Sequence, residues 1–262
     1  MDSSLADWLA LREPADASAR STGLTRALID RLPNPSRLGI VDLGGGTGAN
    51  VRYLGPRLRR GQDWLVVDID AALLARVHAP VADCRVEMRQ QDLGVLHADL
   101  FAGRHLVTAS ALLDLVSESW LESLADHCRR ADAIALFALT YTGCSRCAPE
   151  EPEDDLVREL LNEHQRRNNK GFGRAAGPDA VAAAERAFRT AGYAVRRDAS
   201  DWQLGPDAAA LQRLLVAGWA DAAIEMAPHQ STTIRAWFDR RIAHLRERRS
   251  HIVVGHEDLM AW

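Results

Sequence analysis

The stretch Ile40-Val41-Asp42-Leu43-Gly44-Gly45-Gly46-Thr47-Gly48-Ala49-Asn50 decides the fold of this chain. An apolar run ends at an acid, four glycines follow within five positions, and a helical pattern begins after them. This order predicts a β-strand, a tight turn and the N-terminus of a helix. Glycine tolerates positive φ angles and has no Cβ, so a ligand can lie against the backbone N–H groups of such a turn. Turns of this kind bind a dinucleotide or another nucleoside-bearing ligand, and Gly44-x-Gly46-x-x-Ala49 satisfies the loose dinucleotide pattern.

Acidic residues also end the next two apolar runs. Trp64-Leu65-Val66-Val67-Asp68-Ile69-Asp70 predicts a second strand, and its acid lies about twenty residues beyond the turn, where a ribose-binding carboxylate is expected. A carboxylate suits this position because it accepts hydrogen bonds from two ribose hydroxyls. A third strand is predicted to end at Asp92, and a fourth to end at Ser110.

The order acid-x-Gly-x-Gly-x-Gly, from Asp42 to Gly48, resembles the first motif of the class I S-adenosylmethionine-dependent methyltransferases. The resemblance extends over residues 10 to 200, because the acids after the second and third strands also match that family. It implies a Rossmann-like, doubly wound α/β fold with a mostly parallel seven-stranded sheet, and S-adenosyl-L-methionine as the cofactor. The residues that it assigns to the cofactor are Arg20, Asp42, Gly44, Gly46, Gly48, Asp68, Ile69, Asp92, Leu93 and Ser110.

The assignment of Arg20 depends on an N-terminal helix, which in that family often covers the methyl donor, S-adenosylmethionine. A cation on this helix could pair with the methionine carboxylate, and we favour Arg20 over Arg12 for this role. A solvated surface arginine is the alternative for either residue.

The amino-acid composition fits a single α/β domain, but it is less specific evidence than the sequence motifs. The chain has 262 residues, with 32 basic and 36 acidic side chains and a formal charge of −4. This balance does not favour a nucleic-acid partner, and no apolar run reaches membrane-spanning length. Met1-Asp2-Ser3-Ser4 is not a signal peptide, and four cysteines do not suggest a disulfide scaffold. We therefore expect a cytoplasmic protein without a membrane partner, and the oligomeric state is left open.

The alternation of apolar runs and helical patterns predicts one domain, 1–262, with two inserts. We expect an N-terminal helical cover (1–32, two helices divided at Glu13-Pro14), a donor-binding core (37–141) and helical inserts (142–176 and 207–247) that form a substrate lid. Strands are expected at 38–42, 64–69, 84–91, 105–109, 132–140, 193–199 and 252–254, and helices at 47–59, 71–78, 117–130, 153–168 and 178–191. A parallel strand ends at the edge where ligands bind, so both inserts leave the sheet beside the ligand.

The residues for the methyl acceptor are less well defined. Asp114, Tyr141 and His164 are the polar side chains that we expect in catalytic positions. For Asp114 the alternative is capping of the following loop, and for His164 it is a core position on an apolar helix face. Lys170-Gly171-Phe172-Gly173-Arg174 has the composition of a hinged flap, so we expect Lys170, Phe172 and Arg174 to contact the substrate. A surface loop is the alternative.

Cys144-x-x-Cys147 supplies only half of a tetrahedral metal site, and no second pair accompanies it. We therefore expect no bound metal.

The leading functional hypothesis is an S-adenosylmethionine-dependent methyltransferase acting on a small molecule, with an oxygen or nitrogen acceptor favoured over carbon. An RNA or protein methyltransferase, and a non-catalytic S-adenosylmethionine-binding module, are the alternatives.

Overall fold

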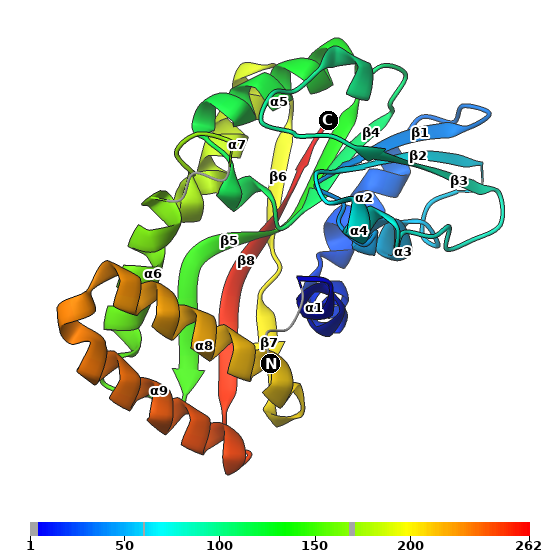
Figure 1. Ribbon diagram of the computed structural model, residues 1–262. Helices are drawn as coiled ribbons and strands as arrows, with labels where there is room; N and C mark the ends of the chain where they lie inside the picture. The colour runs from blue at the N-terminus through cyan, green and yellow to red at the C-terminus, as the bar shows by residue number, and fades with distance from the viewer. Residues whose placement is uncertain (1–4, 60, 168–170) are drawn as a thin grey trace.

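The computed structural model describes residues 5–59, 61–167 and 171–262, and its core is a twisted sheet with helices on both faces (Figure 1). The helices are α1 (Leu5–Ala19), α2 (Thr22–Arg31), α3 (Ala49–Leu54), α4 (Ala71–Leu74), α5 (Glu118–Arg130), α6 (Asp154–Arg167), α7 (Ala180–Thr190), α8 (Ala209–Met226) and α9 (Ser231–Arg246). The strands are β1 (Leu38–Leu43), β2 (Gln62–Asp68), β3 (Cys84–Gln90), β4 (Leu106–Ser110), β5 (Ile134–Ala148), β6 (Val195–Ala199), β7 (Trp202–Leu204) and β8 (His251–Ala261).

The strands follow the order β3-β2-β1-β4-β5-β8-β6. Neighbouring strands from β3 to β5 pair in parallel, whereas β8 is antiparallel to both β5 and β6. The expected doubly wound, mostly parallel α/β fold is therefore confirmed. The short strand β7 pairs with β8 outside this path and was not expected.

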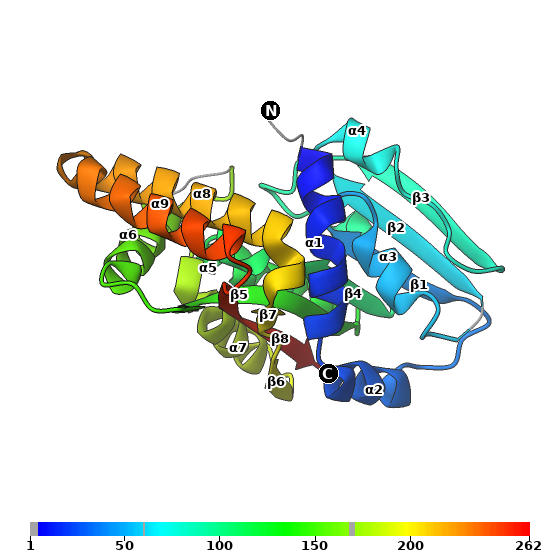
Figure 2. The ribbon, with the colours of Figure 1, turned by 90° about the horizontal axis from the view of Figure 1, so that it is seen from below.

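Two hydrophobic cores cover the two faces of the sheet. On one face, α5 and α7 pack against the strands through residues such as Leu121 and Phe188. On the other face, α2 and α3 pack through Leu28 and Leu54. Figure 2 shows these helices on opposite sides of the strands. Because both faces are covered, β1 is buried along its whole length, as its apolar sequence predicts.

A third core belongs to a part of the chain that we call the second lobe, formed by α6, α8, α9, β7 and the paired ends of β5 and β8. Figure 1 shows both long strands running out of the main sheet into this lobe. β5 was expected to end at residue 140 and β8 to cover only 252–254, so both predictions were too short. Residues 142–148 are therefore strand and not part of a helical insert, because β8 supplies their hydrogen-bonding partner.

Helix α1 corrects a further expectation, since it is continuous and contains Pro14 in its interior. Proline removes one backbone hydrogen bond there and commonly ends or kinks a helix. α1 remains a single helix between two packed surfaces: in Figure 2 it lies between α3 and α8. Its Trp8, Leu11 and Ala15 pack against the second lobe. Helices α3 and α4 are shorter than the expected 47–59 and 71–78, and 207–247 holds two helices.

A buried ion pair in the second lobe provides a test of the fold. The Arg241 side chain is fully buried, and its Nε donates to Asp154 Oδ1 at 3.1 Å. Arg241→Ala leaves the carboxylate without its cation and should lower the free energy of unfolding by about 3–5 kcal/mol. Denaturant unfolding measures this change. Arg248→Ala is the control, because its pair with Asp207 is largely exposed and should contribute less than about 1 kcal/mol. Equal losses in both variants would contradict the prediction.

Candidate functional site

A cavity of about 380 Å³ lies at the carboxyl ends of the parallel strands, where α1 closes it. Residues after β1, β2, β3 and β4 contribute to it because parallel strands end at the same edge of a sheet. The residues of the sequence prediction that line it are Asp42, Gly44, Gly46, Asp68, Ile69, Asp92, Leu93, Ser110 and Phe172. Side chains far apart in the sequence are thus brought to one cavity.

The glycine-rich turn leaves its backbone open to this cavity. Gly46 has a φ of +53°, and a Cβ at this position would lie 3.3 Å from the Leu9 side chain of α1. Gly48 does not line the cavity. With a φ of +82°, it forms the N-cap of α3, and a Cβ there would lie 3.0 Å from Val77. Gly46 therefore keeps space for a ligand, whereas Gly48 permits the entry into α3.

Asp68 connects this turn to the end of β2. Its Oδ2 accepts from the Gly46 N–H at 2.8 Å, and its Oδ1 accepts from the Asp70 N–H at 2.9 Å. A carboxylate offers about four acceptor positions, so two remain for a ligand. Asp70 instead caps α4 by accepting from the Ala72 N–H at 2.8 Å. The hydrogen bonds thus leave free acceptor positions on Asp68 at the cavity wall.

The wall formed after β3 is mainly apolar. Leu93 is buried, and its carbonyl accepts from Trp120 Nε1 at 2.7 Å. Ile69 also lines the cavity, and its side chain is 64% exposed. Asp92 Oδ1 accepts from the Gly94 N–H at 2.8 Å, and this bond fixes the loop. Two aliphatic side chains, Ile69 and Leu93, therefore contribute to the lining of the cavity.

A buried polar network lies at the other end of the cavity. Asn50 Nδ2 donates to Asp42 Oδ1 at 2.8 Å, and Asn50 Oδ1 accepts from Arg20. Asp42 Oδ2 is buried and has no hydrogen-bond partner among the described residues. Burial raises the pKa of Asp42 from its ordinary 3.8 to about 7, although Asn50 and Arg20 lower it. Burial thus favours the protonated form of Asp42 more than water does.

Arg20 lies behind this network and does not line the main cavity. It lines a smaller adjoining cavity of about 140 Å³, which shares Asp16, Ala49 and Ser110 with the main one. Its guanidinium lies 4.2 Å from the centre of the Tyr53 ring. Two of its nitrogens, Nε and Nη2, are buried without a hydrogen-bond partner among the described residues.

No protein-family model and no curated protein sequence matches this chain. Among solved structures, YcgJ from Bacillus subtilis has a TM-score of 0.51 at 14% identity, over 90% of this chain and 97% of that one. A Bacillus halodurans protein, provisionally described as a methyltransferase, has a TM-score of 0.50 at 12% identity, over 90% and 96% of the chains. An S-adenosylmethionine-dependent methyltransferase from Mesorhizobium loti has a TM-score of 0.45 at 19% identity, over 89% and 95% of the chains.

The strand order, with antiparallel β8 between β5 and β6, is the feature that decides the fold family. The chain has the class I methyltransferase fold.

Within this methyltransferase fold, α1 contributes residues that the sequence analysis did not assign to the cavity. Leu5, Leu9, Arg12 and Asp16 follow one another at helical spacing along the cavity wall. Arg12 was the alternative to Arg20, and it lines the main cavity. The helical spacing of these four residues could have indicated a shared face. Because a break was expected at Pro14, the sequence analysis did not treat them as parts of one helix.

The three expected catalytic side chains lie elsewhere. Tyr141 donates to Asn162 Oδ1 at 3.1 Å, and burial raises its pKa. His164 Nε2 lies 3.3 Å from Glu225 Oε2 and joins α6 to α8. Asp114 is buried in a short 3₁₀ turn, Leu113–Leu115. Within the described part of the chain, none of the three lines the main cavity, and their catalytic roles stay predictions.

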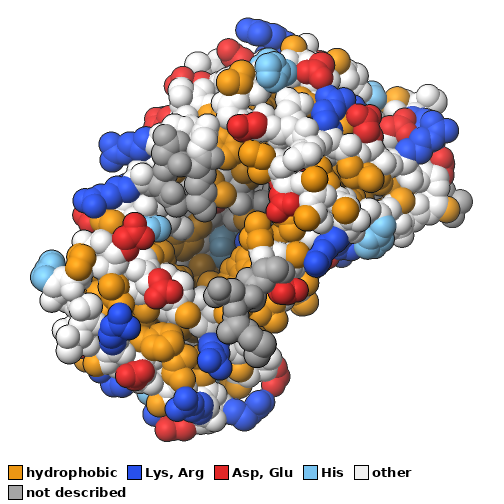
Figure 3. All heavy atoms as spheres, viewed as in Figure 1, with side chains coloured by type: hydrophobic (Ala, Val, Ile, Leu, Met, Phe, Trp, Pro, Cys, Tyr) orange, Lys and Arg blue, Asp and Glu red, His pale blue; other side chains and the backbone are white. Residues whose placement is uncertain are grey.

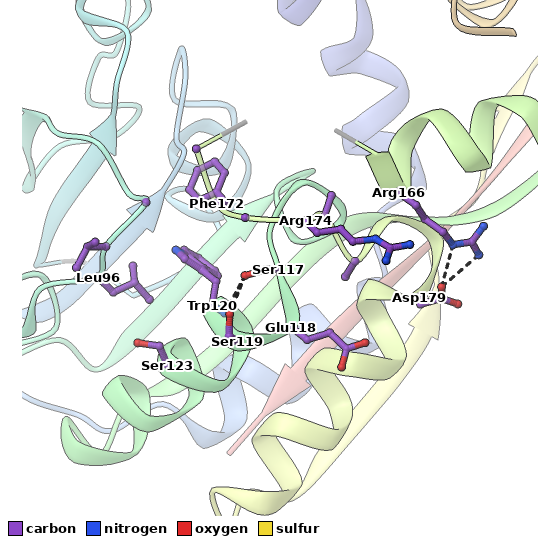
Figure 4. A pocket seen from close by; sticks show the side chains of 16 residues that line it. Leu96, Ser117, Glu118, Ser119, Trp120, Ser123, Arg166, Phe172, Arg174 and Asp179 are labelled. Carbon is purple, nitrogen blue, oxygen red and sulfur yellow. Dashed lines mark hydrogen bonds and ion pairs between the residues drawn. The ribbon is translucent and has the colours of Figure 1, made fainter. Parts of the chain in front are cut away.

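A second cavity of about 820 Å³ adjoins the first, and Phe172 lines both. Figure 4 shows Phe172 beside Trp120; the two rings meet edge to face, with centres 5.9 Å apart. Arg174 extends along this cavity toward the ion pair between Arg166 and Asp179. Lys170 lies outside the described residues. The flap thus meets the main cavity through Phe172, while Arg174 belongs to the second one.

The two cysteines of the C-x-x-C sequence both lie in β5, where Cys144 is exposed and Cys147 is buried. Residues three apart on a strand point to opposite faces. Among residues 5–59, 61–167 and 171–262, no group of three or more His, Cys, Asp or Glu side chains could hold a metal ion. No helix in the same ranges is long and apolar enough to cross a membrane.

The raised pKa of Asp42 predicts a pH dependence of stability. A carboxyl whose folded-state pKa is raised stabilises the fold while it is protonated, and this contribution is lost as the pH rises toward the folded pKa of about 7. Asp42→Asn removes this titration but keeps an acceptor for Asn50. The variant should match the wild-type free energy of unfolding near pH 4 and exceed it near pH 8. A constant difference across this range, measured by urea unfolding, would contradict the assignment.

Proposed function

We infer that this protein is a methyltransferase that uses S-adenosyl-L-methionine to methylate a small molecule, with oxygen or nitrogen as the acceptor atom. The observation that carries this proposal is the single cavity that joins the glycine turn, Asp68 and Asp92 at the carboxyl edge of a methyltransferase fold. The bound cofactor would supply an electrophilic methyl group on a sulfonium sulfur.

The residues of the cavity fit the parts of this cofactor. Free acceptor positions on Asp68 suit the ribose hydroxyls, and the aliphatic side chains of Ile69 and Leu93 suit the adenine ring. Asp92 lines the same cavity and suits the adenine amino group. Gly44 and Gly46 line the cavity without a Cβ, and Asp42, whose Oδ2 has no partner, lines the part that we assign to the amino-acid end.

Arg20 supports the same assignment. Arg20 lines the small cavity that adjoins the main one, and its two unpartnered nitrogens give it the donors that a carboxylate needs. Arg12 is already bound to Asp16, with Nε 2.9 Å from Oδ2. We therefore keep Arg20 as the partner of the methionine carboxylate.

Catalysis in such a site follows mainly from orientation. Methyl transfer removes positive charge from sulfur as it proceeds, so the protein contributes by aligning donor and acceptor and excluding water. Leu9, Leu112 and Leu115 provide apolar walls for this purpose. A general base is required only when the acceptor must lose a proton, and Asp114, Tyr141 and His164 are the proposed groups for acceptor contact.

Entry of the acceptor is proposed between the sheet and the second lobe. Viewed as in Figure 1, the surface is hollowed between these two parts, and hydrophobic side chains surround the opening (Figure 3). The flap residues Phe172 and Arg174 are the proposed substrate contacts, with Lys170 as the third. The absence of a large excess of basic residues favours a small molecule over RNA.

Calorimetric titration tests the cofactor assignment. The wild-type protein should bind S-adenosylmethionine and its demethylated product, and should not bind NAD. Asp68→Ala should weaken binding by about 1.5–3 kcal/mol for each charged hydrogen bond that is lost. Asp63→Ala is a control on the same strand, since Asp63 pairs with Arg37 outside the cavity. Wild-type affinity in Asp68→Ala would remove Asp68 from the site.

The flap variants separate donor and acceptor contacts. Arg174→Ala should reduce methyl transfer while donor affinity stays within about twofold, an energy below 1 kcal/mol. Phe172→Ala should reduce both methyl transfer and donor affinity, because Phe172 lines both cavities. Turnover of small-molecule acceptors and donor titration give the two readouts. Unchanged turnover in both variants, measured with an active acceptor, would make this segment an ordinary surface loop.

A further inference from the structure

The carboxylate of Asp16 is held from two directions in the wall of the main cavity. Arg12 Nε donates to Oδ2 at 2.9 Å and Arg12 Nη2 donates to Oδ1 at 3.2 Å. From β7, Trp202 Nε1 donates to Oδ1 at 3.0 Å. Three of the roughly four acceptor positions of this carboxylate are therefore used, and the remaining one is on Oδ2.

This end of the cavity carries charges of both signs. The carboxylates are Asp16 from α1 and Asp42 from β1, and the Asp42 Oδ2 is unpartnered. Arg20, which has two unpartnered nitrogens, lines the adjoining small cavity together with Asp16. An arrangement of carboxylates beside a guanidinium with two unpartnered nitrogens matches a zwitterionic amino acid, because an ammonium needs acceptors and a carboxylate needs donors.

We propose that Asp16 binds the ammonium of the donor's amino-acid end through Oδ2, and that Trp202 is the positioning residue that fixes Asp16 for this contact. The proposal rests on the proposed function. A sulfonium has no N–H to donate, so the ammonium is the cation that can use the remaining acceptor position.

Trp202 can position Asp16 because its own ring is buried and contacts two neighbouring side chains. The guanidinium of Arg12 lies 5.0 Å from the centre of the ring, and the His256 ring lies at 5.0 Å as well. Trp202 is 3% exposed, and β7 fixes its backbone by pairing with β8. The second lobe therefore orients a side chain of the donor cavity without touching the donor.

The protonation of Asp16 provides a second readout. Burial raises the pKa of Asp16, and the bonds from Arg12 and Trp202 lower it. The charged and titratable groups around it are Arg12 of α1, Arg20 directly after α1, Asp42 of β1 and His256 of β8. His256 stays neutral, since burial lowers its pKa to about 3. Loss of the Trp202 hydrogen bond therefore raises the pKa of Asp16.

Two ligands that differ only at the amino-acid end test the contact. S-adenosylhomocysteine carries the ammonium, and 5′-methylthioadenosine keeps adenosine and sulfur but lacks the amino acid. In Asp16→Asn, affinity for S-adenosylhomocysteine should fall about tenfold to a hundredfold, the range of a charged hydrogen bond, while that for 5′-methylthioadenosine changes less than twofold. An equal loss for both ligands, or none for either, would overturn the proposal.

A pair of tryptophan variants tests the positioning role. Trp202→Phe keeps a ring but removes the N–H. The affinity for S-adenosylhomocysteine should fall severalfold, while the affinity for 5′-methylthioadenosine should not change. The pH below which S-adenosylhomocysteine binding is lost should move to a higher value. Trp237→Phe is the matched control, because Trp237 Nε1 donates to Asp154 at 2.7 Å in the second lobe and neither residue lines the donor cavity. An unshifted pH profile in Trp202→Phe would overturn the role of Trp202.

The wild-type titration separates this proposal from the function on which it rests. Failure of the wild-type protein to bind S-adenosylhomocysteine would reject the donor assignment itself. Wild-type binding, with no discrimination between the two ligands by Asp16→Asn, would reject only the contact with Asp16.

Discussion

The buried carboxylate of Asp258 joins three parts of the protein. From β8, its Oδ1 accepts from the Leu139 N–H in β5 and its Oδ2 accepts from the Ser21 N–H before α2, both at 2.8 Å. Leu139 has a φ of +57°, an unfavourable conformation for a leucine, at a shift in the pairing register. Asp258 is 2% exposed and therefore fixes both the bend in β5 and the junction after α1. The wall that α1 gives to the main cavity depends on that junction.

Helix α1 connects the main cavity to the junction that Asp258 fixes. One side of the helix forms the cavity wall through Leu9 and Arg12, and another packs against the second lobe through Trp8 and Leu11. Glu13 also pairs with Arg52 of α3 at 2.6 Å. The main cavity and the second lobe thus share one helix, and Trp202 of the second lobe donates to Asp16 in the cavity wall.

The sequence alone determined the parts of the site that depend on strand ends. Asp42, Asp68 and Asp92 each follow an apolar run, and parallel strands must bring such positions to one edge. The glycine turn was equally readable, because open backbone requires residues without a Cβ. These features are local in sequence, and the regular alternation of strands and helices was enough to place them together.

Only the tertiary structure decided the other wall and the second lobe. α1 is apolar on two sides, so it lacks the single stripe that marks an amphipathic helix, and packing on both sides keeps Pro14 inside it. Residues 142–148 are too polar to indicate a strand, and they become one because β8 pairs with them. The partners of Tyr141, His164 and Arg20 come from distant elements. Such contacts depend on how elements pack, which no local pattern in the sequence records.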